Sequence, residues 1–141
     1  MDCDQSRGNA SLCVLLFEDS NPVNQPIEPY LSGVANLDFA IEVASDHERG
    51  LSRLSEGGVD AVVLNQPLHD ESQVDVLKRV HAHSPNVPII VTAETGDHES
   101  IIAAVQYGAE DYFIKDEAGP DVLARTIRFA AQVSSLRLRS A

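Results

Sequence analysis

Six residues decide the fold class of this chain: Asp60-Ala61-Val62-Val63-Leu64-Asn65. Their centre is an apolar run, bounded by an acid on one side and an amide on the other. A strand without a polar face must be covered on both sides, as in the parallel sheet of an α/β protein. The run therefore predicts a central strand whose carboxyl end is marked by Asn65.

Four more short β-rich runs alternate with helical patterns along the chain. The predicted strands cover residues 12–17, 39–43, 61–64, 89–92 and 112–114. Five strands alternating with five helices predict an α/β fold with a doubly wound parallel sheet and right-handed connections. In such a sheet the working site lies beyond the carboxyl ends of the strands.

The predicted helices have recognisable ends. Ser45 and Glu48 form a capping box that opens one helix, which stops at the glycine pair 57–58. A short or distorted first helix is expected from Pro26, because a helix that starts there keeps Pro26 and Pro29 within its first turn, where proline is tolerated. The other three helices are predicted from apolar spacing and caps. One carries Val74, Leu77 and Val80 on one face. The next follows Asp97 as cap and is expected to turn Ile101, Ile102 and Val105 inward, and the last opens at Gly119-Pro120-Asp121.

The length of 141 residues fits one domain. We expect a flexible tail over residues 1–10 and the folded domain over residues 11–133. The last helix is expected to continue over residues 134–141, as either a linker to an output domain or a frayed helix end.

Composition excludes several classes of protein. Hydrophobic residues make up 43% and charged residues 23%, which is ordinary for a globular domain. No apolar run is long enough to span a bilayer, and the polar first residues do not resemble a secretory signal. Two cysteines are too few for a disulfide framework, so we expect a cytoplasmic protein. The net charge of −12 disfavours direct binding to nucleic acid or anionic lipid and suits a cation or a basic protein surface.

Polar side chains follow four of the predicted strands. Strand one ends in Glu18-Asp19, strand three in Asn65, strand four in Thr92 and strand five in Lys115. Each has an ordinary structural explanation alone, but the carboxyl ends of parallel strands meet at one edge of the sheet. The pattern therefore predicts a site in which two carboxylates, an amide, a hydroxyl and an ammonium group converge.

Four segments resemble the receiver domains of two-component response regulators, over roughly residues 12–133. They are Leu15-Leu16-Phe17-Glu18-Asp19-Ser20, Asp60-Ala61-Val62-Val63-Leu64-Asn65, Val91-Thr92-Ala93-Glu94 and Gly108-Ala109-Glu110-Asp111-Tyr112-Phe113-Ile114-Lys115. The resemblance implies a flavodoxin-like sheet of order 2-1-3-4-5 and phosphoryl transfer from a histidine kinase to an aspartate. It also implies Mg²⁺ at the acidic pair, a switch formed by Thr92 and Tyr112, and a pocket lysine at Lys115.

The chain departs from that family around the acceptor. Asn65 stands at the position of the phosphorylated aspartate, and His69 and Gln73 replace the usual proline and glycine. An amide cannot form the acyl phosphate that a carboxylate forms. With one charge lost, we expect Mg²⁺ to bind weakly, held by Glu18, Asp19 and the backbone carbonyl of Pro67. Lys115 is expected to bond the Asn65 oxygen or to turn toward Asp19.

The preferred interpretation is a phosphorylation-independent receiver that is not an enzyme and acts through protein–protein contacts. Its partner is a separate protein or a fused output domain, with a homodimer as a further option. The predicted interaction surface is formed by the helix after Asp97, the strand 112–114 and the last helix, with Tyr112 as pivot and Arg125 and Arg128 as a basic rim. Two alternatives stay open: a conventional phosphoacceptor with an engineered or unusual acceptor residue, and a sensor of a small ligand or metal.

Overall fold

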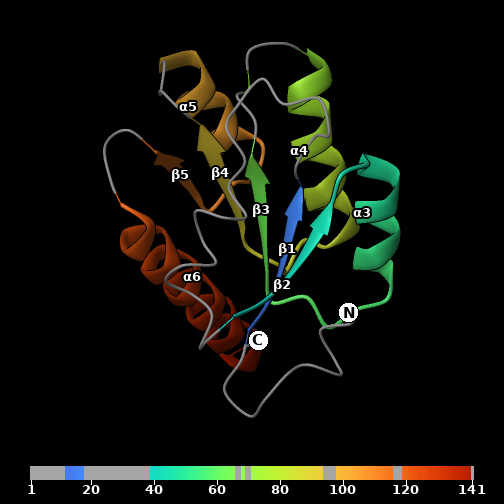
Figure 1. Ribbon diagram of the computed structural model, residues 1–141, viewed down its shortest axis with the longest axis vertical. Coiled ribbons are helices and arrows are strands. Elements are labelled where there is room, and N and C mark those ends of the chain that lie inside the picture. Colours follow the sequence, from blue (N-terminus) through green and yellow to red (C-terminus); the bar gives the residue numbers. More distant parts are fainter. Residues whose placement is uncertain are drawn as a thin grey trace.

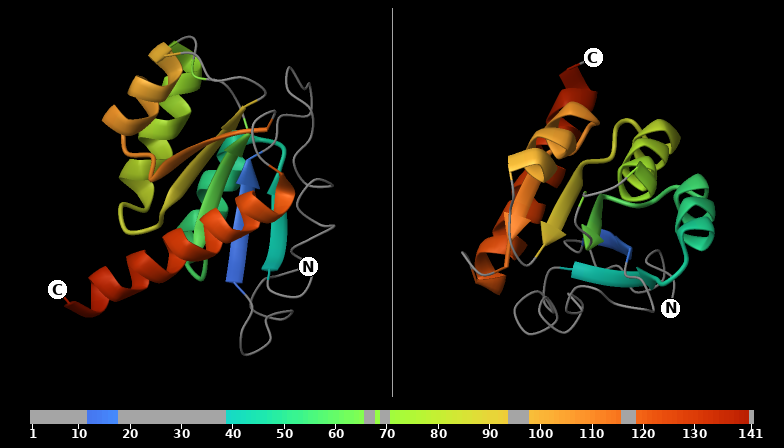
Figure 2. Two further views of the ribbon diagram at one scale, coloured as in Figure 1. Left: turned by 90° about the vertical axis from the view of Figure 1, so that its left-hand side faces the viewer. Right: turned by 90° about the horizontal axis from the view of Figure 1, so that it is seen from above.

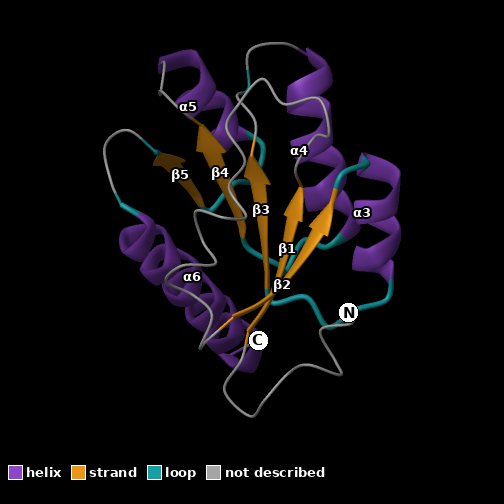
Figure 3. Cartoon of the chain, viewed as in Figure 1, coloured by secondary structure: helices purple, strands orange, loops and turns teal. Residues whose placement is uncertain are grey.

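The structure, a computed structural model, describes residues 12–17, 39–65, 68, 71–93, 98–115 and 119–140, with the side chains of Phe39, Pro120 and 135–140 excepted. Within these residues five strands alternate with four helices (Figures 1 and 3). The elements are β1 (Leu12–Phe17), β2 (Phe39–Ala44), α3 (His47–Ser55), β3 (Ala61–Asn65), α4 (Glu71–His83), β4 (Ile89–Ala93), α5 (His98–Gln106), β5 (Asp111–Ile114) and α6 (Pro120–Ser140). The helix predicted from Pro26 lies outside the described residues.

The five strands form one parallel sheet in the order β2-β1-β3-β4-β5. The predicted fold class and strand order are therefore confirmed, and the strand bounds differ from the prediction by at most one residue. Figure 1 shows the strands pointing in one direction, so that their carboxyl ends share one edge. The order reverses between β1 and β3, where ligands bind in sheets of this kind.

Each face of the sheet has its own apolar core, because successive strand side chains point to opposite faces. Leu15 and Leu64 belong to the core covered by α3, α4 and α5, while Leu16 and Val63 belong to the core covered by α6. Figure 2 shows α6 on one side of the sheet and α3 and α4 on the other. The continuous apolar run of β3 thus reflects burial on both faces.

The cap of α3 differs from the predicted capping box. The N-cap is Asp46, with an extended backbone, and its side chain accepts a hydrogen bond from the Glu48 backbone N–H at 2.8 Å. Ser45 lies one residue too early, since the helix begins at His47. The Glu48 side chain instead forms an ion pair with Arg79 of α4 at 2.8 Å.

The prediction that the apolar residues of α5 face inward is wrong for Ile102 and Val105, whose side chains are 50% and 70% exposed. The buried positions of α5 are Ser100 and Ala104. Small side chains let the helix approach the sheet closely, and they leave the larger ones on the outside. The four-residue apolar stretch 101–104 continues into Val105, so helical periodicity could not choose the buried face.

The last helix begins at Pro120 as predicted and continues to Ser140. Leu123 and Ile127 are fully buried against the sheet, and Ser134 Oγ donates to the backbone carbonyl of Asn86 at 2.5 Å. The C-terminal end of α6 projects sideways away from the sheet (Figure 2). No helix in the described part of the chain is long and apolar enough to cross a membrane.

Replacing Gly50 of α3 by alanine should destabilise the protein, because a Cβ there would collide with the ring carbons Cε2 and Cζ of Phe17. Overpacking of this kind costs about 1–3 kcal/mol. At an open helical position the same change would instead stabilise by about 1 kcal/mol. Urea unfolding of Gly50→Ala, with the exposed Ser52→Ala as control, shows whether the free energy of unfolding falls or rises. A more stable Gly50→Ala protein would show that α3 is not pressed against β1.

Candidate functional site

Three of the predicted site residues lie together at the carboxyl edge of the sheet. Asn65 ends β3, Thr92 is its register partner in β4, and Lys115 directly follows β5. Lys115 is fixed to the neighbouring strand by its backbone N–H, which donates to the Ala93 carbonyl at 2.9 Å. The strand ends therefore bring an amide, a hydroxyl and an ammonium group to one place, as the sequence predicts.

The amide oxygen of Asn65 is the centre of this arrangement. It accepts a hydrogen bond from Thr92 Oγ1 at 2.9 Å and another from Lys115 Nζ at 3.2 Å. Asn65 is 7% exposed and Thr92 is fully buried. Of the two positions expected for Lys115, the structure shows the one in which the ammonium group bonds Asn65.

The chemistry of this site follows from the amide. Two donors, the Thr92 hydroxyl and one N–H of the Lys115 ammonium group, converge on an oxygen that carries no formal charge. The amide nitrogen is conjugated with the carbonyl and is not a nucleophile. The described residues therefore form a hydrogen-bonded contact across β3, β4 and β5, without the carboxylate that phosphoryl transfer requires.

The described part of the site offers a divalent cation a neutral oxygen at position 65. Mg²⁺ prefers charged oxygen ligands, whereas the Asn65 oxygen is neutral and already accepts the Lys115 ammonium group. Among the residues described, no group of three or more His, Cys, Asp and Glu side chains could hold a metal ion. The predicted ligands Glu18, Asp19 and Pro67 lie outside the described residues.

Tyr112, the predicted switch residue, lies on β5 with its hydroxyl group buried. Its ring packs against the core that α3, α4 and α5 cover, and its register partner in β4 is Val91. Its backbone N–H donates to the Asp111 carboxylate at 2.8 Å. The structure thus places the tyrosine ring inward, in the core on the α5 side of β5.

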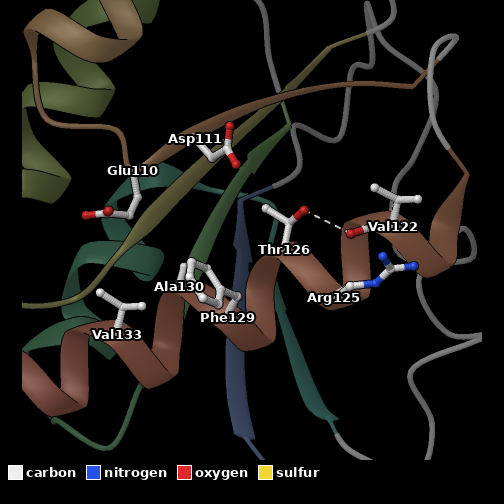
Figure 4. A pocket seen from close by; sticks show the side chains of 8 residues that line it. All are labelled: Glu110, Asp111, Val122, Arg125, Thr126, Phe129, Ala130 and Val133. Atoms are coloured by element: carbon white, nitrogen blue, oxygen red, sulfur yellow. Dashed lines mark hydrogen bonds between the residues drawn. The ribbon is translucent and has the colours of Figure 1, made fainter.

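Sequence reasoning missed a groove between the start of β5 and the outer surface of α6. It holds about 580 Å³. Glu110 and Asp111 lie on one side and the α6 side chains on the other (Figure 4). It is lined by Glu110, Asp111, Val122, Arg125, Thr126, Phe129, Ala130 and Val133. Of the two predicted rim arginines, Arg125 is exposed in this groove, whereas Arg128 is half-buried.

One signal in the sequence could have located this groove. Val122 and Phe129 are seven residues apart, so they lie on one face of α6. That face is not the one that buries Leu123 and Ile127, and Phe129 is 67% exposed. A second apolar stripe on a helix that already has a buried face indicates a contact surface.

Comparisons with known proteins agree with this fold. A family model described as "Response regulator receiver domain" matches residues 14–128. Transcriptional regulatory protein DltR of Streptococcus agalactiae is 32% identical over 124 residues, which are 87% of this chain and 53% of that protein. Transcriptional regulatory protein QseB of Haemophilus influenzae is 29% identical over 112 residues, 79% of this chain and 49% of that protein. The chain thus spans about half the length of these relatives.

Solved structures share the fold at lower identity. The signal receiver domain of an HD domain-containing protein from Pseudomonas fluorescens has a TM-score of 0.76 at 22% identity, covering 95% of this chain and 96% of that one. A CheY-like receiver domain from Methanospirillum hungatei has a TM-score of 0.73 at 16% identity, covering 90% and 98%. These likenesses show the fold alone.

The contact between Thr92 and Asn65 should be measurable as stability. Thr92→Val removes the donor without changing the size of the buried side chain, so we expect a loss of about 1–2 kcal/mol. In an Asn65→Ala background the same change should cost less, because the acceptor is already gone. Urea unfolding of the four proteins of this double-mutant cycle gives the coupling energy. Equal costs in both backgrounds would mean that the hydrogen bond contributes nothing.

Proposed function

This chain belongs to the response regulator receiver domain family of two-component signalling, and from that premise we propose that it works as a receiver without phosphorylation at the usual site. It is a regulatory protein-interaction module, and the proposal assigns it no catalysis. The observation that carries the proposal is the Asn65 oxygen, which accepts both Thr92 and Lys115. These are the hydroxyl and ammonium groups that the family resemblance assigns to the phosphoryl pocket.

The interaction surface of this proposal is the α5–β5–α6 face. Five large apolar side chains among the described residues are exposed, and four of them belong to α5 or α6. They are Ile102 and Val105 of α5, and Val122 and Phe129 of α6. Val122 and Phe129 line the groove, and exposed apolar side chains of this kind support a contact surface.

The three predicted interaction residues have different roles in this proposal. Tyr112 supports the face from inside, because its hydroxyl group is buried and its ring packs in the core. Arg125 is exposed in the groove and is positioned for direct contact. Arg128 is half-buried, so its contribution is to the edge of the face.

The partner is a protein surface, either on a separate chain or on a fused output domain. In the relatives named transcriptional regulators the match covers only 49% and 53% of the protein, which supports an output domain in the remainder. A second copy of this chain is the other occupant considered. A cytoplasmic location without direct contact to nucleic acid or lipid remains part of the proposal, in keeping with the net charge of −12.

Incubation with acetyl phosphate and Mg²⁺ should leave the intact mass of the protein unchanged, because position 65 has no carboxylate nucleophile. Mass spectrometry before and after incubation is the measurement. Asn65→Asp is the matched variant, and it should label slowly at most, since His69 and Gln73 also depart from the family pattern. A stable phosphoryl adduct on the unmodified chain would show that it is a conventional receiver and contradict the proposal.

Mg²⁺ should bind weakly, with Glu18 and Asp19 as the carboxylate ligands. Removing one carboxylate from the cage lowers the affinity, because Mg²⁺ exchanges its water only for strong oxygen ligands. Calorimetric titration of the unmodified chain and of Asn65→Asp should give tighter binding for the aspartate variant. Saturation of the unmodified chain at micromolar Mg²⁺ would contradict the prediction.

A further inference from the structure

We propose that Cys13 and Cys3 form a thiol–disulfide switch, which ties the N-terminal segment to β1 when it is oxidised and releases that segment when it is reduced. Its reaction partner is a low-molecular-weight thiol such as glutathione. The site belongs to β1 and β2, at the far end of the strand order from β5. The inference does not rest on the function proposed above.

The structure shows Cys13 in a disulfide. Its sulfur is bonded to another cysteine, and no cysteine in the described part of the chain is free. The chain contains two cysteines, of which Cys3 lies outside the described residues. Cys13 is completely buried, so its sulfur cannot reach a second copy of the chain. By elimination, the partner is Cys3 of the same chain.

A largely buried ion pair lies beside the Cys13 sulfur. Arg53 of α3 donates to Glu42 of β2 from two guanidinium nitrogens, Nε to Oε1 at 2.9 Å and Nη2 to Oε2 at 3.2 Å. The two side chains are 12% and 19% exposed. A further hydrogen bond from Nη1 to the Gly57 carbonyl at 2.7 Å holds the guanidinium group in place. The sulfur therefore has a cation and an anion at fixed positions next to it.

These two charged groups suit both oxidation states of the sulfur. A disulfide sulfur carries no hydrogen and can only accept, and Arg53 Nη2 donates to Sγ at 3.9 Å. A thiol can also donate, and Glu42 Oε2 lies 3.9 Å from the same sulfur, where it accepts the S–H after reduction. A sulfur atom with a partner in each state loses no hydrogen bond when its state changes.

The backbone at Cys13 is held independently of its sulfur. The Cys13 N–H donates to Asp60 Oδ2 at 2.8 Å, and the Cys13 carbonyl accepts the Asp60 N–H at 2.8 Å. The strand β1 is also paired on both sides, with β2 and β3. Opening the disulfide therefore leaves β1 in place, and the change is confined to the segment that carries Cys3.

The burial of Cys13 decides the course of the exchange. The thiolate of the external thiol attacks the Cys3 sulfur, because the Cys13 sulfur is buried. The S–S bond breaks, and its electron pair leaves on Cys13 as a thiolate that the Arg53 guanidinium stabilises until a proton is taken up. A second external thiol then attacks the mixed disulfide and releases the Cys3 thiol. Two small thiols are oxidised to one small disulfide, and both cysteines are reduced.

A reversible bond fits the cytoplasmic location proposed above. Glutathione keeps most cytoplasmic thiols reduced, so disulfides in that compartment are mainly transient or redox-sensing. Closing the short loop between Cys3 and Cys13 also restricts the unfolded chain, which makes the oxidised form the more stable one. Oxidation of the cell interior would thus tether the N-terminal segment and stabilise the domain.

The first test counts thiols in the full chain. After equilibration with glutathione disulfide and denaturation, iodoacetamide should label no cysteine, and after dithiothreitol it should label two, as read by intact mass. Peptide mapping without reductant should join Cys3 to Cys13. Two labelled cysteines in the oxidised sample, glutathione adducts in place of the internal bond, or a disulfide-linked dimer would each overturn the inference.

The rate at which glutathione opens the oxidised chain tests the role of Arg53. Arg53→Met should slow opening about tenfold, because the departing thiolate loses its cation. Glu42→Gln should accelerate opening by removing the neighbouring negative charge. Arg79→Met is the matched control, since it breaks the exposed ion pair with Glu48 between α3 and α4 and should leave the rate unchanged. If Arg53 only held the structure together, its loss would loosen the site and speed opening, and that result would contradict the assigned role.

The melting temperature tests the tether. The oxidised chain should melt on the order of 5–10 °C above the reduced chain. Cys3→Ser keeps the Cys13 thiol beside Glu42 and removes the tether, so it should melt with the reduced chain under both conditions. A difference between the two conditions that persists in Cys3→Ser would overturn the inference. An oxidised chain that glutathione at cytoplasmic concentration cannot open would also overturn it, because the bond would then be structural.

Discussion

Two hydrogen bonds on one oxygen atom hold the carboxyl edge of this sheet together. Thr92 of β4 and Lys115 after β5 both donate to the Asn65 oxygen at the end of β3. Three strand ends are thereby joined through an uncharged acceptor. Buried polar groups are costly when unsatisfied, and here one amide oxygen accepts a hydrogen bond from a buried hydroxyl and another from an ammonium group.

The function proposed for this domain is carried by its surface. Small buried side chains bring α5 close to the sheet and leave Ile102 and Val105 exposed, while α6 buries Leu123 and Ile127 and exposes Phe129. Tyr112 of β5 packs its half-buried side chain against the core on the α5 side of the sheet. The exposed apolar side chains and the amide contact are thus features of the same folded structure.

The sequence predicted the strands and the meeting of Asn65, Thr92 and Lys115, because parallel strands covered on both faces must be apolar and must end at one edge. The strand order was predicted from the family resemblance and not from the apolar pattern. Prediction failed where several choices satisfied the same pattern. The apolar stretch of α5 is compatible with more than one buried face, and in the structure the buried face is formed by the small residues Ser100 and Ala104. Asp46 replaced Ser45 as the cap because both are capping residues, and tertiary packing set the first turn.

The central claim is that the amide contact at Asn65 fixes this receiver in one state without a phosphoryl group. The most direct measurement is the two-dimensional amide NMR spectrum of the unmodified chain during addition of acetyl phosphate with Mg²⁺, following Thr92, Tyr112 and Lys115. The account predicts that these three resonances stay where they were, while Asn65→Asp responds under the same conditions. A shift of all three in the unmodified chain, beyond that given by Mg²⁺ alone, would show that the site still switches.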